Sequence, residues 1–564
     1  MQNDSRLVVL AVMLMASWGA MAAEPPPPVT PIRHLVVIVG ENNAFDTLFA
    51  TFKPEPGASV ANLLSRGIVD EEGRPGPEYS KAMQKTAAAA GRYAVGFEQT
   101  SPYKALPVPW GRDRYGVPFR PDSRVADKLP PGPYQITRYV SYGTYTGVDP
   151  VHRFFNMWQQ VNGGRHDLFT WVGETSGEGS TQKGNPSSGT NRGGEAMGFY
   201  NMSKGDAPFF ASYAKRFTLA DNYHQSIMGG TMANYIALAT ADVASYLTDG
   251  KPAVPPDDEI ENPEPLGGSA NWYTRSGYSS GSYTACADAA QPGVDAIRKV
   301  IEALPYPAFR AGNCDASHYY LVNNYKPPYE ADGTLRRRQS HIATPQSMPT
   351  IAESLSAAGV SWKWYSGGRD GEKSTREYCG VCDALTFFPQ VMETPLRQRL
   401  QGLMELYADI DGEMPAVSFV VPPNTKSGHP GYSNVAALEG FLAEVVGRIE
   451  ARPALWANTA VLLTFDEGGG YYDSGPIQIV DFFGDGTRIP LLAISPWAKK
   501  GHVEHTYYDH ASILKFIERN WHLKPLSARS RDNLPNPRSG ADPYVPANRP
   551  AVGDLFELFD FKAP

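Results

Sequence analysis

The chain has 564 residues, 42% of them hydrophobic and 20% charged, which is the composition of a globular protein with a large core. The formal net charge is −8, from 51 basic and 59 acidic residues, so the charge gives no reason to expect a nucleic acid partner. The 54 glycines and 49 prolines indicate many ordered loops and argue against a helical bundle.

The first residues have the pattern of an export signal. Arg6 precedes the apolar run LVVLAVMLMASWGAMA, and Ala20-Met21-Ala22 fits a small-residue cleavage site. We therefore predict a signal peptide over residues 1–22 and an exported protein, either periplasmic or secreted. An uncleaved membrane anchor is the alternative, but the run is short and no second one follows, so no transmembrane segment is expected in the mature chain.

Apolar, β-branched runs alternate with amphipathic stretches along the chain. This alternation predicts an α/β fold whose sheet is largely parallel and has helices on both faces. The predicted strands are 34–40, 217–223, 360–366, 416–421, 459–465 and 488–495. The predicted helices are 232–243, 349–359, 435–451 and 510–521.

Two long segments interrupt this pattern. Residues 53–145 and 246–313 are rich in proline, glycine, tyrosine and aspartate, and we interpret them as insertions that form a smaller cap lobe. They lie within one predicted domain over residues 23–525. Residues 526–564 form a polar, proline-rich tail that we expect to pack on the same domain.

The chain has four cysteines, Cys286, Cys314, Cys379 and Cys382. In an exported protein this even number predicts two disulfides, with three possible pairings. On sequence separation alone we expect Cys286 to pair with Cys314, and Cys379 with Cys382. The CGVC stretch also fits a redox motif, or less well a zinc site, but neither a thioredoxin-like pattern nor a second ligand pair accompanies it.

Acidic and amide side chains follow two of the predicted strands. Glu41 and Asn42 come directly after the first strand, and Asp466 and Glu467 come directly after the fifth. In open α/β folds, sites lie beyond the carboxyl ends of the strands. Three carboxylates at one place repel one another unless a cation is bound, so we predict a site for Mg²⁺, Ca²⁺ or Mn²⁺, with Zn²⁺ or Fe tolerable. Taken singly, each acidic residue would more often be a helix cap or a solvated loop residue.

The stretch DNYHQSIMGGTMANY places two glycines before Thr231, at the start of a predicted helix. Thr231 could be the N-cap of that helix. It could also be a nucleophile, because the helix N-terminus favours an anion and a bound metal would lower the pKa of the hydroxyl. The glycines would let the backbone approach a ligand closely. No motif of a serine hydrolase, a zincin or a P-loop NTPase is present.

Several segments, in this order, resemble the bacterial phosphoesterase family that contains non-haemolytic phospholipases C and secreted acid phosphatases. The segments are IRHLVVIVGENNAFDTLF, VHRFFNMWQQVNGGRHDLF, LADNYHQSIMGGTMANY, HYYLVNNY, TFDEGGGYYD and RIPLLAISPWAKKGHVEHTYYDHASILKFIE. The resemblance covers most of residues 32–525 apart from the two insertions. It implies the sandwich fold of the alkaline-phosphatase-like superfamily.

The resemblance implies one divalent metal ion, held by Glu41, Asn42, Thr231, Asp466 and Glu467. Thr231 would attack phosphorus in line and form a phosphothreonine, which water then hydrolyses.

The resemblance also places three further residues at the site. Asn234 would lie near the phosphate, and His152 and His429 would line the pocket. Either histidine could donate to phosphoryl oxygens or protonate the leaving group. For each histidine, a hydrogen-bonded loop residue without a chemical role is the alternative.

The sequence departs from the family at three places. ENNAFD stands where ENRSFD is frequent, Gly468 stands where DEHGG has its histidine, and CDALTFF stands where many members have DPF. These differences affect the substrate pocket more than the metal ligands. We expect an exported metal-dependent phosphomonoesterase of the acid phosphatase kind. The alternatives are a phospholipase C acting on phosphatidylcholine-like phosphodiesters and a non-catalytic binding protein. The expected ligands are small phosphate esters or phospholipid head groups.

Overall fold

The computed structural model describes residues 27–88, 90–112, 118–119, 121–125, 128–147, 149–176, 193–269, 271–275, 281–337 and 341–562. The predicted signal peptide, residues 1–22, lies outside these ranges. Within them, no helix is both long enough and apolar enough to cross a membrane.

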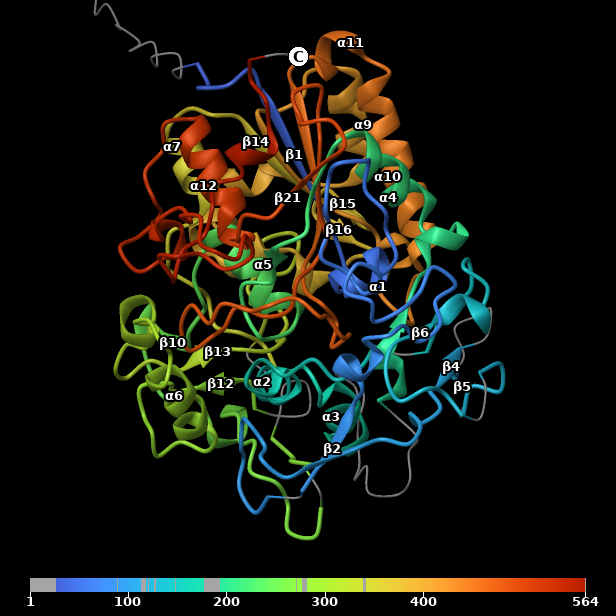
Figure 1. The fold of residues 1–564 in the computed structure, drawn as a ribbon. Coiled ribbons are helices and arrows are strands. Elements are labelled where there is room, and N and C mark those ends of the chain that lie inside the picture. The colour runs from blue at the N-terminus through green and yellow to red at the C-terminus, as the bar shows by residue number, and fades with distance from the viewer. Residues whose placement is uncertain are drawn as a thin grey trace, which may run out of the picture.

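An eight-stranded sheet forms the centre of the upper part of the molecule in Figure 1. The strand order is β17-β14-β18-β1-β19-β20-β8-β21, and within this sheet only β20 runs antiparallel to its neighbours. The strands are β1 (His34–Gly40), β8 (Thr218–Ala220), β14 (Trp362–Ser366), β17 (Leu400–Gln401), β18 (Val417–Val421), β19 (Thr459–Phe465), β20 (Leu491–Ile494) and β21 (His502–Glu504). The central strands are buried on both faces, which explains why they read as continuous apolar runs.

Helices cover both faces of the sheet. α5, α7 and α12 pack together on one side, and α4, α9, α10 and α11 on the other (Figure 1). Their bounds are α4 (Pro208–Arg216), α5 (Thr231–Thr240), α7 (Ile351–Ala357), α9 (Leu403–Asp411), α10 (Val435–Glu450), α11 (Pro453–Trp456) and α12 (His510–Asn520). The predicted α/β fold with a largely parallel sheet is confirmed.

A second group of elements lies below the sheet in Figure 1. It joins the two segments interpreted as insertions to α2 and α3, and its strands pair in short two-stranded ribbons. The elements are β2 (Lys85–Ala87), β3 (Thr100–Pro102), β4 (Gly111–Arg112), β5 (Pro118–Phe119), β6 (Tyr134–Gln135), α2 (Phe154–Val161), α3 (Phe169–Ser176), β7 (Gly198–Phe199), β10 (Leu247–Thr248), β11 (Lys251–Pro252), β12 (Tyr283–Thr284), α6 (Val294–Glu302) and β13 (Tyr320–Leu321). The remaining elements are α1 (Phe45–Phe49), β9 (Tyr223–His224), β15 (Arg369–Asp370), β16 (Lys373–Ser374), α8 (Pro389–Met392) and β22 (Tyr508–Asp509).

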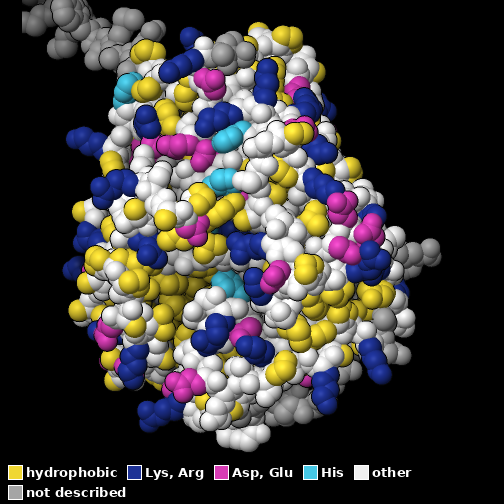
Figure 2. Space-filling model, viewed as in Figure 1, with side chains coloured by type: hydrophobic (Ala, Val, Ile, Leu, Met, Phe, Trp, Pro, Cys, Tyr) yellow, Lys and Arg dark blue, Asp and Glu magenta, His cyan; other side chains and the backbone are white. Residues whose placement is uncertain are grey.

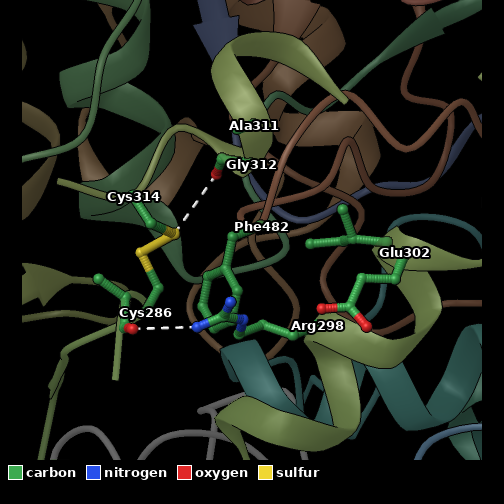
Figure 3. A pocket seen from close by; sticks show the side chains of 9 residues that line it. Cys286, Arg298, Glu302, Ala311, Gly312, Cys314 and Phe482 are labelled. Atoms are coloured by element: carbon green, nitrogen blue, oxygen red, sulfur yellow. Dashed lines mark hydrogen bonds between the residues drawn. A yellow bond between two sulfur atoms is a disulfide. The ribbon is translucent and has the colours of Figure 1, made fainter. Parts of the chain in front are cut away.

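Both predicted disulfides are present, Cys286–Cys314 and Cys379–Cys382. The first joins the end of β12 to a loop after α6 and lines a pocket together with Arg298 (Figure 3). The second closes a short turn, and its Cys382 is fully buried in the core beside the sheet.

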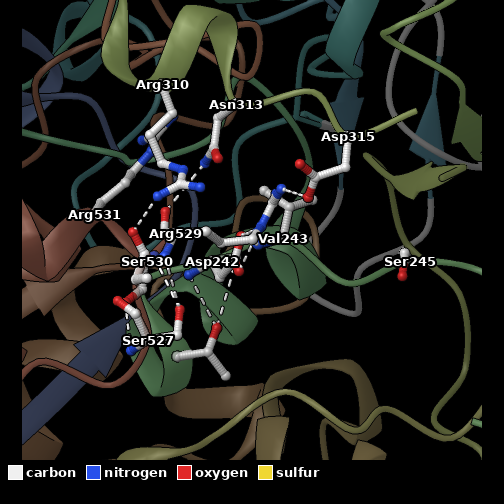
Figure 4. Close-up of polar contacts among 12 residues, drawn as sticks. Asp242, Val243, Ser245, Arg310, Asn313, Asp315, Ser527, Arg529, Ser530 and Arg531 are labelled. Carbon is white, nitrogen blue, oxygen red and sulfur yellow. Dashed lines mark hydrogen bonds and ion pairs between the residues drawn. The ribbon is translucent and has the colours of Figure 1, made fainter. Parts of the chain in front are cut away.

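The segment after α12 is attached to the body of the molecule through arginines. Arg529 Nε donates to both carboxylate oxygens of Asp242, at 2.9 and 2.8 Å, and its Nη1 lies 2.6 Å from Asp315 Oδ2 (Figure 4). The buried Arg531 donates from Nη1 to Asp485 Oδ1 at 2.8 Å. Detaching the tail would break these ion pairs and leave buried charges uncompensated, so the two arginines hold the tail against the body of the molecule.

On the face shown in Figure 2, basic and acidic side chains are interspersed, as the small net charge leads one to expect.

Candidate active site

The ends of β1 and β19 form the floor of the site. The two strands are parallel neighbours, so the residues that follow them lie side by side. The backbone N–H groups of Asn42 and Glu467 both donate to Asp466 Oδ1, at 3.0 and 2.8 Å. Glu41, Asn42, Asp466 and Glu467 are between 0% and 4% exposed. The structure thus brings the four residues expected to bind metal into one buried cluster.

The carboxyl groups of this cluster have raised pKa values. Desolvation by burial is the largest cause for each, raising the pKa of Glu41 and Glu467 well above the usual range and that of Asp466 to about 7. The nearby Asp466 and Asp149 carboxylates raise the pKa of Glu41 and Glu467 further. Backbone hydrogen bonds oppose the shift at Asp466. Such a cluster is stabilised either by protons or by a cation.

The amide of Asn42 is oriented by its neighbours. His429 Nδ1 donates to Pro430 O at 2.8 Å, so His429 Nε2 is the acceptor that faces Asn42 Nδ2 at 3.2 Å. Asn42 Nδ2 also donates to Asp149 Oδ2 at 3.3 Å. Among the described residues, neither Asn42 Oδ1 nor Asp466 Oδ2 has a hydrogen-bond donor, although both are buried. Buried oxygen atoms that accept no hydrogen bond can coordinate a cation instead, so these two atoms fit the divalent metal ion that the sequence predicts.

Thr231 is the first residue of α5 and is 4% exposed. Its hydroxyl lies near the Asp466 carboxylate and lowers the pKa of that carboxyl against the effect of burial. The N-cap of the helix is Gly230, and no side chain caps the helix from that position. The interpretation of Thr231 as the N-cap is therefore wrong, because the helix already begins at Thr231, one residue earlier than a capping threonine would require.

The two glycines before Thr231 are required by packing within the chain. A Cβ on Gly229 would lie 2.1 Å from Val322 O, and a Cβ on Gly230 would lie 2.7 Å from Asn324 Oδ1. Asn324 Oδ1 accepts a hydrogen bond from Met232 N at 2.7 Å, so another segment satisfies this helix terminus. The absence of side chains at the two glycines permits this packing against residues 322–324. From the sequence, the glycines were expected to let the backbone approach a ligand closely.

Asn234 supports the loop before Thr231. Its side-chain amide makes four hydrogen bonds, all to backbone groups of residues 227–230. This network fixes the turn that leads into α5, which places Asn234 behind the nucleophile candidate.

His152 enters the site from the loop before α2. Its Nδ1 donates a hydrogen bond to Pro150 O at 2.7 Å, so Nε2 is the ring nitrogen that can take up or release a proton. Nε2 lies 3.3 Å from Glu467 Oε1. His152 is 4% exposed, which makes this an interior contact rather than one screened by bulk water.

Asp149 is a site residue that the sequence analysis missed. Its Oδ2 atom lies 3.4 Å from His152 Nδ1, 3.3 Å from Asn42 Nδ2 and 3.9 Å from His429 Nε2. It therefore contacts three of the residues predicted to line the site. The sequence feature that could have indicated Asp149 is its position at the start of DPVHRFF, three residues before His152.

Comparison with known proteins identifies relatives. Residues 32–524 match the Phosphoesterase family. The chain is 26% identical over 413 residues to the hemolytic phospholipase C of Pseudomonas aeruginosa, covering 65% of this chain and 43% of that protein. It is 22% identical over 599 residues to phospholipase C A of Mycobacterium tuberculosis, covering 98% of this chain and 83% of that protein. The chain spans less than half the length of the first three curated relatives it matches.

A solved structure of a protein in the alkaline phosphatase superfamily from Vibrio parahaemolyticus aligns with 62% of this chain and 63% of its own. The TM-score is 0.27 and the identity 10%, so this likeness carries no argument about the chemistry of the site.

Proposed function

The chain belongs to the Phosphoesterase family, and from this premise we propose that it is a metal-dependent phosphodiesterase of the phospholipase C type. The curated relatives are phospholipases C, which favours this alternative over the phosphomonoesterase expected from the sequence. The observation that carries the proposal is the buried carboxylate cluster in which the Thr231 hydroxyl meets Asp466.

The residues of the cluster would hold one divalent metal ion: Glu41, Asn42, Thr231, Asp466 and Glu467. When bound, the ion supplies positive charge that favours the ionised hydroxyl and the charge developing on the phosphate. The start of α5 adds partial positive charge at the same place.

The reaction then has two displacement steps at phosphorus. Thr231 Oγ1 attacks phosphorus, the bond from phosphorus to the glycerol oxygen breaks, and the diacylglycerol leaves with a proton. Water next attacks phosphorus, the bond to Thr231 Oγ1 breaks, and the phosphorylated head group is released. We assign the proton donor to His152 rather than His429, because His429 Nε2 already accepts from Asn42.

We place the working protein outside the reducing cytoplasm. Disulfides form and persist in oxidising compartments, and the structure contains two of them. Together with the predicted signal peptide, they support an exported protein that is periplasmic or secreted.

A pair of chromogenic substrates tests the proposal. We expect kcat/KM for p-nitrophenylphosphocholine to exceed that for p-nitrophenyl phosphate at least about tenfold, since the site acts on a diester. A Thr231→Ala preparation purified in the same way controls for contaminating phosphatases. Preference for the monoester would instead support an acid phosphatase, and hydrolysis of neither would support the binding-protein alternative.

Asp149 provides a second test. We expect Asp149→Asn to lower kcat/KM for the diester about 10- to 100-fold, because the side chain orients Asn42, His152 and His429 around the cluster. Thermal stability should not fall, since the change removes a charge that repels Glu41 and Glu467. Asp295→Asn, on the exposed face of α6, is a matched control. Unchanged kinetics in Asp149→Asn would remove this residue from the site.

A further inference from the structure

The Cys379–Cys382 disulfide lies directly against one of the proposed metal ligands. Cys382 Sγ is 3.5 Å from Glu41 Oε1, and both residues are buried. A disulfide sulfur carries no proton, so this contact is van der Waals packing rather than a hydrogen bond. Cys379 lies at the edge of the core and is less buried than Cys382.

The three side chains have the chemistry and spacing of a metal site once the disulfide is open. One oxygen of Glu41 and the two sulfur atoms all lie within 4.8 Å of one another. Zinc bonds of about 2.3 Å to sulfur and about 2.1 Å to oxygen, at tetrahedral angles, separate the two ligand atoms by about 3.6 Å. The observed 3.5 Å between Cys382 Sγ and Glu41 Oε1 matches this separation. Cysteines separated by two residues are also the usual spacing of zinc ligands.

The turn that carries the cysteines is held in place without the disulfide. Tyr378 Oη donates to Asp383 Oδ2 at 2.8 Å, and Arg369 Nη1 donates to the same oxygen at 3.0 Å. The Arg369–Asp383 ion pair is almost completely buried, with side chains 1% and 0% exposed. These bonds flank the cysteines on both sides, so reduction leaves the two thiols beside Glu41.

We propose that reduction of Cys379–Cys382 creates a second metal site, in which two thiolates and the Glu41 carboxylate bind a thiophilic divalent ion such as Zn²⁺ or Cd²⁺. A dithiol or a phosphine supplies the two electrons that break the S–S bond. The dithiol is itself oxidised to a disulfide, whereas the phosphine takes an oxygen atom from water and becomes a phosphine oxide. Each sulfur takes up one proton as the bond opens. The metal displaces both protons when it binds the sulfurs.

A consequence for activity rests on the proposed function. If Glu41 is a ligand of the phosphoesterase centre, an ion held by the thiolates draws that ligand toward the sulfurs. The chain is then inactive while reduced and metal-loaded. It becomes active in an oxidising compartment, where a disulfide oxidant takes two electrons from the two sulfurs, is itself reduced to two thiolates, and the metal ion leaves as the S–S bond forms. The disulfide therefore couples the phosphodiesterase to export.

Cadmium titration of the full chain tests the site without any reference to activity. We expect the protein reduced with a phosphine to develop cadmium–thiolate absorption in the ultraviolet that saturates at one ion per chain. Two of its thiols should then be protected from Ellman's reagent. The oxidised protein should show neither change.

Variants assign the signal to this site. The Cys286→Ser/Cys314→Ser variant keeps only the CGVC disulfide and should retain the full signal after reduction. The Cys379→Ser/Cys382→Ser variant should lose it, and Glu41→Gln should weaken cadmium binding at least about tenfold. Equal signals in the oxidised and reduced protein, or cadmium binding unaffected by Glu41→Gln, would overturn the proposal.

The activity consequence has its own measurement. Zinc added to the reduced Cys286→Ser/Cys314→Ser variant should lower diester hydrolysis at least about tenfold, and reoxidation after zinc removal should restore it. Persistent activity with the thiolates loaded would show that Glu41 is not a catalytic metal ligand. The cadmium signal would stand in that case, so the two failures are distinguishable.

Discussion

Replacing Thr231 with alanine is expected to lower kcat/KM for p-nitrophenylphosphocholine at least about a thousandfold. The substitution removes the only atom that can form the covalent intermediate in the proposed reaction, and loss of a nucleophile has effects of this size or larger. Oriented binding and the remaining electrostatic groups leave some residual rate.

The same substitution should have little effect on the fold. It removes the interaction of the hydroxyl with Asp466, and even a full hydrogen bond contributes only about 1 kcal/mol to the free energy of unfolding. In a chain of 564 residues, whose entropy of unfolding is about 1.2 kcal/mol/K, this corresponds to a fall in Tm of only about 1 °C.

Thr240→Ala is the matched control for this experiment. Thr240 is a buried threonine in the same helix, and its hydroxyl donates to Ile236 O at 2.7 Å, at the far end of α5. Its replacement should leave kcat/KM close to that of the wild type. A Thr231→Ala enzyme with wild-type kinetics would show that another group forms the bond to phosphorus.

Without a bound metal ion, the folded state is expected to become less stable as the pH rises. In the metal-free cluster, burial raises the pKa of Asp466 to about 7 from an ordinary value near 4, so the folded protein holds a proton that the unfolded chain has released. Stability is therefore highest below the unfolded pKa and falls as the pH rises toward 7. For Asp466 alone the loss amounts to about 4 kcal/mol, and the raised pKa values of Glu41 and Glu467 act in the same direction.

Thermal unfolding at pH 5 and pH 8 measures this effect. We expect the Tm of chelator-treated protein to fall between these values, and added divalent metal to raise the Tm more at pH 8, where the ligands are ionised. Other buried groups also titrate, so the difference between wild type and Asp466→Asn isolates the cluster. The variant should lose part of the pH dependence. A metal-free Tm that is unchanged or rises from pH 5 to pH 8 would contradict the proposed electrostatics.

The sequence predicts the central strands well because these strands are buried on both faces. The predicted ranges 34–40 and 459–465 coincide with β1 and β19, since buried parallel strands are continuous apolar runs. The strand predicted over 217–223 is shorter in the structure, Thr218–Ala220, because the chain leaves the central sheet there and Tyr223 begins the separate strand β9, which pairs with β22. The edge strands β17 and β21 contain too few residues to produce a recognisable pattern.

Site residues could be predicted where a strand end or a helix start positions them. Glu41 and Asp466 follow adjacent strands, and Thr231 begins α5. Asp149 could not be found in this way, because it lies in a loop before α2. The contact of Cys382 with Glu41 joins residues 341 positions apart, and no local pattern carries such information.

The measurement that tests the account most directly is identification of the covalent intermediate. The enzyme is mixed with p-nitrophenylphosphocholine, quenched rapidly in acid, digested and analysed by mass spectrometry. The proposed mechanism predicts a phosphocholine adduct on Thr231 and none in the Thr231→Ala protein. An adduct on a different residue, or turnover with no adduct at any quench time, would contradict the assignment of Thr231 as the nucleophile.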